Sequence, residues 1–325
     1  MTKNPTIRER ERERERESNS ARPKIVVFRE GKLTTEQKSR LEKLGDVTYI
    51  DKLPKTGAEY LADVHGADII CSVTAGFAEA SSQLRDVFVS FPFVSVAFAD
   101  LELLRRNNVT VANAPGANKH AVSEWVMCMV ILLMRQFYGA INSDEIARSA
   151  SSLPLSTKSL SDSKMTILGR GNVGQRVAEI AKGFEMNVRF FNRGDDLYDS
   201  VNDADVVVNT LSSNPTTIGL LDAKFFAAMK QDSYFVSVSR EEIIDDDALI
   251  DALDNDHLAG AATDLGDIYV GDITNFEYQR LKNHPKILAT PHIAYSATKS
   301  ERLGNDIMID NVEKYLAGEP QNIVN

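Results

Sequence analysis

The sequence predicts an α/β protein made of two doubly wound parallel sheets that are covered by helices. Three observations lead to this fold class. The chain has 325 residues, about twice the size of an ordinary domain. Short runs of β-branched and aromatic residues alternate with stretches of helical period, which is typical of parallel sheets. This alternation occurs twice, before and after a long apolar segment, so we expect two domains.

The composition is that of a globular protein, with 43% apolar and 26% charged residues. The longest apolar run, Trp125–Met134, has ten residues, whereas a helix needs about 20 to span a bilayer. The first residues contain no apolar run typical of a secretory signal peptide, and the sequence contains two cysteines, Cys71 and Cys128. We therefore expect no membrane span and no disulfide framework, and a reducing cytoplasm as the location.

The chain is acidic except at its start. Its net charge is −10, and residues 1–22 contain seven Lys or Arg and five Glu, so residues 23–325 carry −12. This sign argues against nucleic-acid binding, because it repels phosphates. The alternation of Arg and Glu from Arg8 to Glu17 has no apolar face to bury. We expect residues 1–22 to be a disordered tail.

The first series of elements begins at Lys24 and ends at the loop Asn113–Gly116. Runs of β-branched and aromatic residues predict its strands, and stretches of helical period predict its helices. In chain order, we expect the strand Ile25–Phe28, the helix Thr34–Leu44, the strand Val47–Ile50, the helix Ala58–His65, the strand Ala67–Val73, the apolar runs Val87–Val89 and Phe93–Ala97, the helix Leu101–Arg106 and the strand Val109–Val111.

The segment Ala121–Phe137 is apolar on nearly every side and precedes a Ser-rich stretch, Ser149–Ser163. A helix that is apolar all round is buried by more than one partner. We interpret it as a core helix, with a contact to a second subunit as an additional role.

The second series opens with a nucleotide-binding signature. The strand Lys164–Leu168 is followed at once by Gly169-Arg170-Gly171-Asn172-Val173-Gly174, a helical stretch to Gly183 and a second strand, Asn187–Phe191. Three glycines at this spacing are a weak signal alone, but between a strand and a helix they predict dinucleotide binding. Gly169 permits the tight turn, Gly171 lets the backbone approach the pyrophosphate, and Gly174 lets helix and strand pack closely. The amides of the helix start, including Asn172 and Val173, then meet the phosphates.

The choice of cofactor is made where the second strand ends. An NAD site usually has an Asp or Glu there, whereas this chain has Asn192-Arg193-Gly194. A guanidinium binds a 2′-phosphate, so Arg193 favours NADP(H). The alternative is that Arg193 is a solvated surface residue and the site takes NAD. We expect Leu211, Ser212 and Val238 to line the cofactor site as well.

Further blocks of sequence, together with the glycine turn, resemble the D-isomer-specific 2-hydroxyacid dehydrogenases over roughly residues 24–325. These blocks are Tyr234–Arg240, Leu258–Asp264, Thr290–Ile293, Asn113–Gly116, Ala121–Glu124 and Asn322–Asn325. The resemblance implies a discontinuous substrate domain from residues 23–118 and 297–325, and a Rossmann domain from residues 119–296 that binds the dinucleotide. Catalysis is then expected in the cleft between these two domains.

The resemblance also implies the catalytic roles. Arg240 matches the arginine that holds the substrate carboxylate and polarises the keto oxygen, and His292 matches the general acid/base. Asp264 matches the aspartate that orients the nicotinamide carboxamide. The chemistry agrees, because a guanidinium suits a carboxylate and an imidazole titrates near neutrality. No histidine has a metal-ligand spacing, so we expect no metal.

The sequence departs from the family pattern at three places. The family usually has a Glu five positions after the aspartate, and here that position is Tyr269. A phenol brings no negative charge at neutral pH to raise the pKa of His292, so Asp267 or Asp272 is the alternative partner. The second departure is Glu241, which follows Arg240 at a position where the family usually has a Gly, and Glu242 comes next. These two carboxylates either orient the guanidinium or face solvent. The third departure is a bulkier substrate loop, Phe93–Phe98.

The substrate side is expected at Val73, Thr74, Ser95 and Val96. There is no Lys or Arg between Ala67 and Gln83, which argues against a phosphorylated substrate. We thus expect an NADP(H)-preferring reductase of a small, unphosphorylated, apolar 2-oxo acid. The family resemblance implies that the protein is a homodimer. Two alternatives stay open: a nucleotide-sensing interaction protein like the corepressors that resemble this superfamily, and a dehydrogenase of formate or phosphite.

Overall fold

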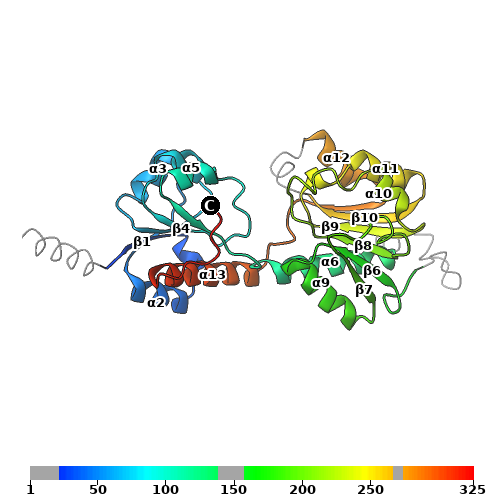
Figure 1. The fold of residues 1–325 in the computed structure, drawn as a ribbon, viewed down its shortest axis with the longest axis horizontal. Coiled ribbons are helices and arrows are strands. Elements are labelled where there is room, and N and C mark those ends of the chain that lie inside the picture. The colour runs from blue at the N-terminus through cyan, green and yellow to red at the C-terminus, as the bar shows by residue number, and fades with distance from the viewer. Residues whose placement is uncertain (1–21, 138–156, 266–273) are drawn as a thin grey trace, which may run out of the picture. The chain divides into compact units, whose positions relative to one another are not determined.

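The structure, a computed structural model, describes residues 22–137, 157–265 and 274–325. The expected tail lies almost wholly outside them. The chain divides into two compact units, Met1–Ala117 with Glu301–Asn325, and Asn118–Ser300 (Figure 1). The first unit is therefore built from both ends of the chain. We describe each unit by itself.

The first unit contains a five-stranded sheet in the order β2-β1-β3-β4-β5, and every pairing between its strands is parallel. The strands are β1 (Lys24–Phe28), β2 (Asp46–Ile50), β3 (Ile69–Cys71), β4 (Phe88–Ser90) and β5 (Thr110–Ala112). The helices are α2 (Thr35–Leu44), α3 (Gly57–Asp63), α4 (Phe77–Ala80), α5 (Leu101–Arg106) and most of α13 (Thr298–Leu316). The apolar run Phe93–Ala97 forms a loop after β4 instead of a strand.

Two apolar clusters cover the two faces of this sheet. One gathers aromatic rings beneath the loops that follow β3 and β4: Phe28, Tyr60, Phe77, Phe91 and Phe98. The other packs α2 and α13 against the opposite face through Leu41, Ile309 and Val312 (Figure 1). The backbone of α13 comes close to the loop after β4, because a Cβ added at Gly304 would lie 2.2 Å from the oxygen of Pro92.

The second unit contains a six-stranded sheet in the order β11-β10-β9-β8-β6-β7, again with every strand pairing parallel. The strands are β6 (Lys164–Leu168), β7 (Asn187–Phe191), β8 (Val206–Asn209), β9 (Ser233–Ser237), β10 (Leu258–Asp264) and β11 (Ile287–Thr290). Two parallel sheets with helices on both faces confirm the predicted fold class. Because β6 pairs with β7 on one side and β8 on the other, the winding reverses at β6.

Helices cover both faces of the second sheet (Figure 1). On one face lie α10 (Ala223–Ala228), α11 (Asp246–Asp254) and α12 (Phe276–Asn283), and on the other lie α6 (Lys119–Met134) and α9 (Asn172–Gly183). One side of α6 is buried against α9 and β9, through Val126, Val130 and Met134. Its other side keeps apolar residues such as Trp125 and Cys128 only partly covered. One side of this helix is thus buried in the core, as expected, and the other side is not.

No helix in the described ranges is long and apolar enough to cross a membrane. Both cysteines are free thiols, and burial raises the pKa of Cys71 to about 12.

Candidate active site

The glycine turn after β6 is tight because its neighbours leave no room for side chains. Gly169 has a φ of +100°, and a Cβ there would lie 2.9 Å from both the backbone oxygen and the hydroxyl of Thr210. A Cβ on Gly174 would lie 2.1 Å from the oxygen of Gly169. Thr210 closes the turn, since its hydroxyl lies 3.0 Å from the oxygen of Leu168. These two glycines are required by the protein's own packing.

Gly171 is different, because no packing contact within the described ranges requires a glycine there. Its φ of −77° and ψ of −171° suit any residue, and no atom lies within 4 Å of the Cβ that could be added. It is the N-cap of α9, and no side chain of the described residues caps that helix start. Open space beside the amides of Asn172 and Val173 therefore fits the pyrophosphate of a dinucleotide, which would lie against the bare backbone.

The end of β7 contains an acidic residue that the sequence analysis did not consider. The carboxylate of Asp195 turns back onto Asn192 and accepts hydrogen bonds from its backbone N–H at 2.8 Å and from its Nδ2 at 3.0 Å. Asp and Asn side chains commonly bond to nearby backbone groups in turns. The presence of Asn192 and Asp195 three residues apart was therefore the sequence signal for this turn. Arg193, between them, is exposed. The strand end thus carries a guanidinium and a carboxylate tied to Asn192.

Two buried polar residues join the loops that follow β8 and β9. The amide of Asn209 accepts a hydrogen bond from the N–H of Leu211 and donates to the hydroxyl of Ser237 at 3.2 Å. Ser239 donates from its hydroxyl to the oxygen of Leu211 at 2.8 Å. This network fixes the backbone of both loops, on which the predicted cofactor contacts Leu211, Ser212 and Val238 lie. The sequence analysis did not identify Asn209 or Ser237, since their role arises only when β8 and β9 pair.

Arg240 stands three residues after the end of β9, immediately before the short helix Glu241–Ile243. Its Nε lies 3.9 Å from a carboxylate oxygen of Glu242. The same oxygen accepts a 2.7 Å hydrogen bond from the hydroxyl of Ser213, in the loop after β8. Glu242 thus lies at the Nε edge of the guanidinium, and Ser213 holds its carboxylate there.

His292 lies in a strained turn that Asp264 holds. The backbone of His292 is left-handed, with a φ of +52°, which is costly for a residue with a side chain. Asp264, at the end of β10 and only 5% exposed, accepts three hydrogen bonds from residues around it. They come from the hydroxyl of Thr290 at 2.5 Å and from the N–H groups of Ile293 and Ala294, both at 2.9 Å. Both carboxylate oxygens are used, so Asp264 holds the backbone that follows His292 and the side chain of Thr290 that precedes it.

This geometry gives Asp264 a role that the resemblance did not imply. Its partners are the backbone of Ile293 and Ala294 and the hydroxyl of Thr290, and the contact with the nicotinamide carboxamide that the resemblance implies stays a prediction. The ring of His292 also packs edge-on against Tyr295, with ring centroids 5.2 Å apart. The residues expected to partner His292 from the preceding loop, Tyr269 with Asp267 and Asp272 as alternatives, lie outside the described residues.

Within the second unit, the predicted catalytic residues share one edge of the sheet. Arg240 follows β9, Asp264 ends β10 and His292 follows β11, and these three strands are adjacent and parallel. Strands in a sheet lie about 5 Å apart, so the ends of β9 and β11 are about 10 Å apart. The glycine turn follows β6 at the same edge. Polar groups at the carboxyl ends of parallel strands are where such folds bind ligands.

The four residues expected on the substrate side lie in the first unit, after β3 and β4. Val73 and Val96 are buried in the aromatic cluster, so only their backbones can meet a ligand. Thr74 and Ser95 are exposed. The loop after β3 rests on Tyr60, whose hydroxyl lies 2.6 Å from that of Ser72, which in turn donates to the oxygen of Val73. Burial raises the pKa of Tyr60, so its phenol stays protonated and able to donate.

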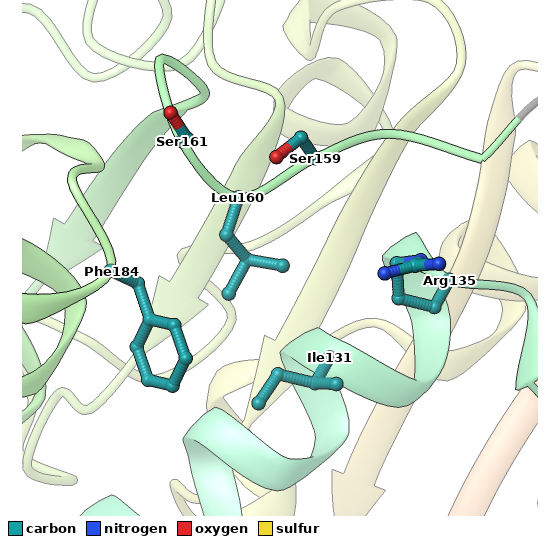
Figure 2. Close-up of a pocket in the computed structure, with 6 residues that line it drawn as sticks. All are labelled: Ile131, Arg135, Ser159, Leu160, Ser161 and Phe184. Carbon is teal, nitrogen blue, oxygen red and sulfur yellow. The ribbon is translucent and has the colours of Figure 1, made fainter.

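A surface hollow of about 290 Å³ lies elsewhere on the second unit. It is lined by Ile131, Arg135, Ser159, Leu160, Ser161 and Phe184. Figure 2 shows Leu160 directed between Ile131 and Phe184. These residues lie before β6 and at the ends of α6 and α9, and so at the opposite edge of the sheet from the glycine turn.

Comparison with known proteins adds the family context. Residues 127–294 match the model for the NAD-binding domain of D-isomer specific 2-hydroxyacid dehydrogenases. A Staphylococcus epidermidis protein, classed by inference as a 2-hydroxyacid dehydrogenase, is 25% identical over 245 residues, which is 70% of this chain and 75% of that protein. The D-lactate dehydrogenase of Treponema pallidum has a TM-score of 0.79 at 23% identity, over 93% of this chain and 99% of its own. An acyclic imino acid reductase solved with NADPH and D-Arg has a TM-score of 0.75 at 22% identity, over 93% of this chain and all of its own.

The two glycines that start α9 predict opposite consequences of substitution. Gly171→Ala should cost at most about 1 kcal/mol of stability but weaken dinucleotide binding by about tenfold or more, because the new methyl group occupies the open space beside the helix start. Gly174→Ala should cost roughly 3 kcal/mol, because its Cβ would overlap the oxygen of Gly169. Urea unfolding and calorimetric titration with NADH and NADPH measure both. Full cofactor affinity in Gly171→Ala would contradict the placement of the pyrophosphate.

Proposed function

The chain belongs to the D-isomer specific 2-hydroxyacid dehydrogenase family, an oxidoreductase family with a nicotinamide cofactor, and from this premise we propose a specific reaction. The protein reduces a small, unphosphorylated 2-oxo acid to the 2-hydroxy acid, with NADP(H) preferred to NAD(H). The observation that carries this proposal is the gathering of Arg240, Asp264 and His292 at one sheet edge, the same edge as the open space at Gly171.

The cofactor is held by the turn and the loops of the second unit. Gly171 admits the pyrophosphate, the amides of Asn172 and Val173 meet it, and Leu211, Ser212 and Val238 line the path beyond it. The nicotinamide ring, when bound, accepts or donates the hydride. The network of Asn209, Ser237 and Ser239 keeps these loops in place, so little backbone ordering is left to be done when the cofactor binds.

Arg240 binds and polarises the substrate. Glu242 lies at the Nε edge of its guanidinium, and in this proposal the guanidinium binds the substrate carboxylate and the adjacent keto oxygen. A planar guanidinium matches a carboxylate with two parallel hydrogen bonds. The positive charge also stabilises the negative charge that develops on the keto oxygen during reduction.

His292 supplies the proton that becomes part of the alcohol, and takes it back in the reverse direction. Its imidazole must keep one direction to do so, and Asp264 contributes to this by holding the backbone of the two residues that follow His292. Asp264 is therefore a positioning residue for His292 in this proposal.

Arg193 is the feature that favours NADP(H), since a guanidinium at the end of β7 attracts a 2′-phosphate. Asp195 would accept the ribose hydroxyls of NAD, yet one of its oxygens is occupied by Asn192. The acyclic imino acid reductase, which shares this fold, was solved with NADPH. We propose that both cofactors bind and that NADPH is used with the higher kcat/KM.

The substrate is unphosphorylated in this proposal. The loop after β3 contains no Lys or Arg from Ala67 to Gln83, so a phosphate would lack a charged partner. Thr74 and Ser95 would contact the substrate through exposed side chains, whereas Val73 and Val96 would do so through their backbones. The aromatic cluster beneath these loops favours an apolar substrate side chain.

The reaction is tested by a panel of 2-oxo acids with NADPH and NADH, and of 2-hydroxy acids, formate and phosphite with the oxidised cofactors. Nicotinamide absorbance gives the rates. We expect turnover with an apolar 2-oxo acid. Turnover with formate or phosphite alone would show that one of these, and not a 2-oxo acid, is the substrate. No turnover with any compound would favour the nucleotide-sensing interaction protein.

Substitution of the two proposed catalytic residues separates chemistry from binding. Arg240→Ala and His292→Ala should each lower kcat by about 100-fold or more, because one loses the carboxylate partner and the other the proton donor. Cofactor affinity, measured by fluorescence titration with NADPH, should remain close to that of the parent protein. Full activity in His292→Ala would remove the imidazole from the mechanism.

We also propose a homodimer through the open side of α6. The indole nitrogen of Trp125 is buried and has no hydrogen-bond partner in the described part of the chain. The partly covered apolar residues of α6 include Trp125 and Ile131, and Ile131 also lines the hollow beside Phe184 (Figure 2). A second copy would cover this apolar surface.

The dimer is tested by placing a charge on this surface. Phe184 is 43% exposed, so Phe184→Glu should leave folding intact and weaken association. Sedimentation equilibrium should give twice the 36.0 kDa chain mass for the parent protein and the chain mass for the variant. Tyr198→Glu, at a residue that is 42% exposed on the same unit, is the control and should stay dimeric. A parent protein that sediments as a monomer would contradict the proposal.

A further inference from the structure

We propose that Arg170, inside the glycine turn, is a second guanidinium that binds the 2′-phosphate of NADP(H) together with Arg193. This inference rests on the proposed preference for NADP(H) and deepens it by naming a residue that the glycine pattern leaves variable. Neither the fold nor the packing of the turn needs an arginine at this position.

The pairing of β6 with β7 places the two arginines at the same sheet edge. Leu168 and Phe191, the last residues of the two strands, are Cα partners in this parallel pair. Arg170 is two residues beyond Leu168, and Arg193 is two residues beyond Phe191. Adjacent strands lie about 5 Å apart, so each arginine leaves its strand end next to the other. A ribose bound between the glycine turn and the end of β7 would lie beside both.

The side chain of Arg170 already leans towards β7. Its guanidinium carbon lies 5.2 Å from the ring centroid of Phe190. Phe190 and Asn192 are two residues apart and so point to the same face of the strand. The guanidinium therefore covers the face that leads to the Asn192 turn. Its backbone is fixed as well, because Gln175 donates from Nε2 to the Arg170 oxygen at 2.9 Å.

Neither arginine forms an ion pair within the described part of the chain. Among the residues that the structure describes, no carboxylate lies within 4.0 Å of Arg170 or Arg193, although many other arginines of this chain form ion pairs. Arg170 is exposed, apart from its contact with Phe190. Two neighbouring cations repel each other, and a bound dianion would turn this repulsion into attraction.

The contact with Phe190 gives Arg170 a property that a lysine would lack. A guanidinium stacked on a ring keeps its N–H groups directed outward at its edge, where they can bind two phosphate oxygens at once. Arg193 would bind the same group from the other strand end. NAD offers only a hydroxyl at this position, so both contacts add to the affinity for NADP(H) alone.

Calorimetric titration with adenosine 2′,5′-bisphosphate and with 5′-AMP measures this contact without any catalytic step. The ratio of the two affinities reports the 2′-phosphate. Arg170→Leu, which keeps apolar cover on Phe190, should lower the ratio by about 10- to 100-fold, as expected for a charge-assisted hydrogen bond. The affinity ratio of Arg170→Lys should lie between those of the parent protein and Arg170→Leu. Arg193→Leu should lower the ratio by a factor similar to that of Arg170→Leu.

Lys182→Gln is the matched control, because it removes one positive charge from the last turn of α9, about 15 Å from the helix start. It should leave the ratio unchanged. If the parent protein does not prefer the bisphosphate, both the NADP(H) preference and the role of Arg170 are wrong. A second outcome is that the parent prefers the bisphosphate, and that Arg193→Leu loses this preference while Arg170→Leu keeps it. In that case only the role of Arg170 is wrong. An equal loss in Lys182→Gln would show a general effect of charge and would also overturn the contact.

Discussion

The candidate site depends on one buried carboxylate, that of Asp264, which holds the turn that carries His292. The left-handed backbone of His292 is unfavourable for a residue with a side chain, by about 1 kcal/mol or more. Three hydrogen bonds to Asp264 stabilise it, from the hydroxyl of Thr290 before His292 and from the N–H groups of Ile293 and Ala294 after it. Because β10 and β11 pair in register up to Asp264 and Thr290, this contact ties the turn to the end of β10. It therefore fixes the backbone from which the imidazole projects.

The other functional groups are ordered by the same principle, the meeting of parallel strand ends. Asn209 and Ser237 join the loops after β8 and β9, and Glu242 reaches Ser213 across the same pair of loops. Each contact joins polar side chains at or just beyond the ends of β8 and β9. The loops beside the glycine turn are therefore preorganised, and no atom of the described residues lies within 4 Å of a Cβ that could be added at Gly171.

Sequence patterns predicted the fold class and the glycine turn because both depend on local periodicity and spacing. Arg240 and His292 could be placed at strand ends for the same reason. The pattern could not predict what Asp264 contacts, since its partners lie 26 to 30 residues away and meet it only after β10 and β11 pair. It also missed Asp195, which folds back on Asn192, and it could not tell that the aromatic cluster buries the side chains of Val73 and Val96. Alternation of apolar residues along α6 could not distinguish a side covered by α9 from a side left open.

The most direct test of this account is the Asp264→Asn variant, with kcat and the cofactor Kd measured on the same preparation. The amide keeps the size of the carboxylate but sets a second donor against an N–H group of the turn. If Asp264 positions His292, kcat should fall by about 10- to 100-fold, the range expected from one unsatisfied buried donor, while the Kd of NADPH stays nearly constant. Weaker NADPH binding with an unchanged kcat would contradict the account. It would indicate that Asp264 contacts the nicotinamide instead of positioning His292.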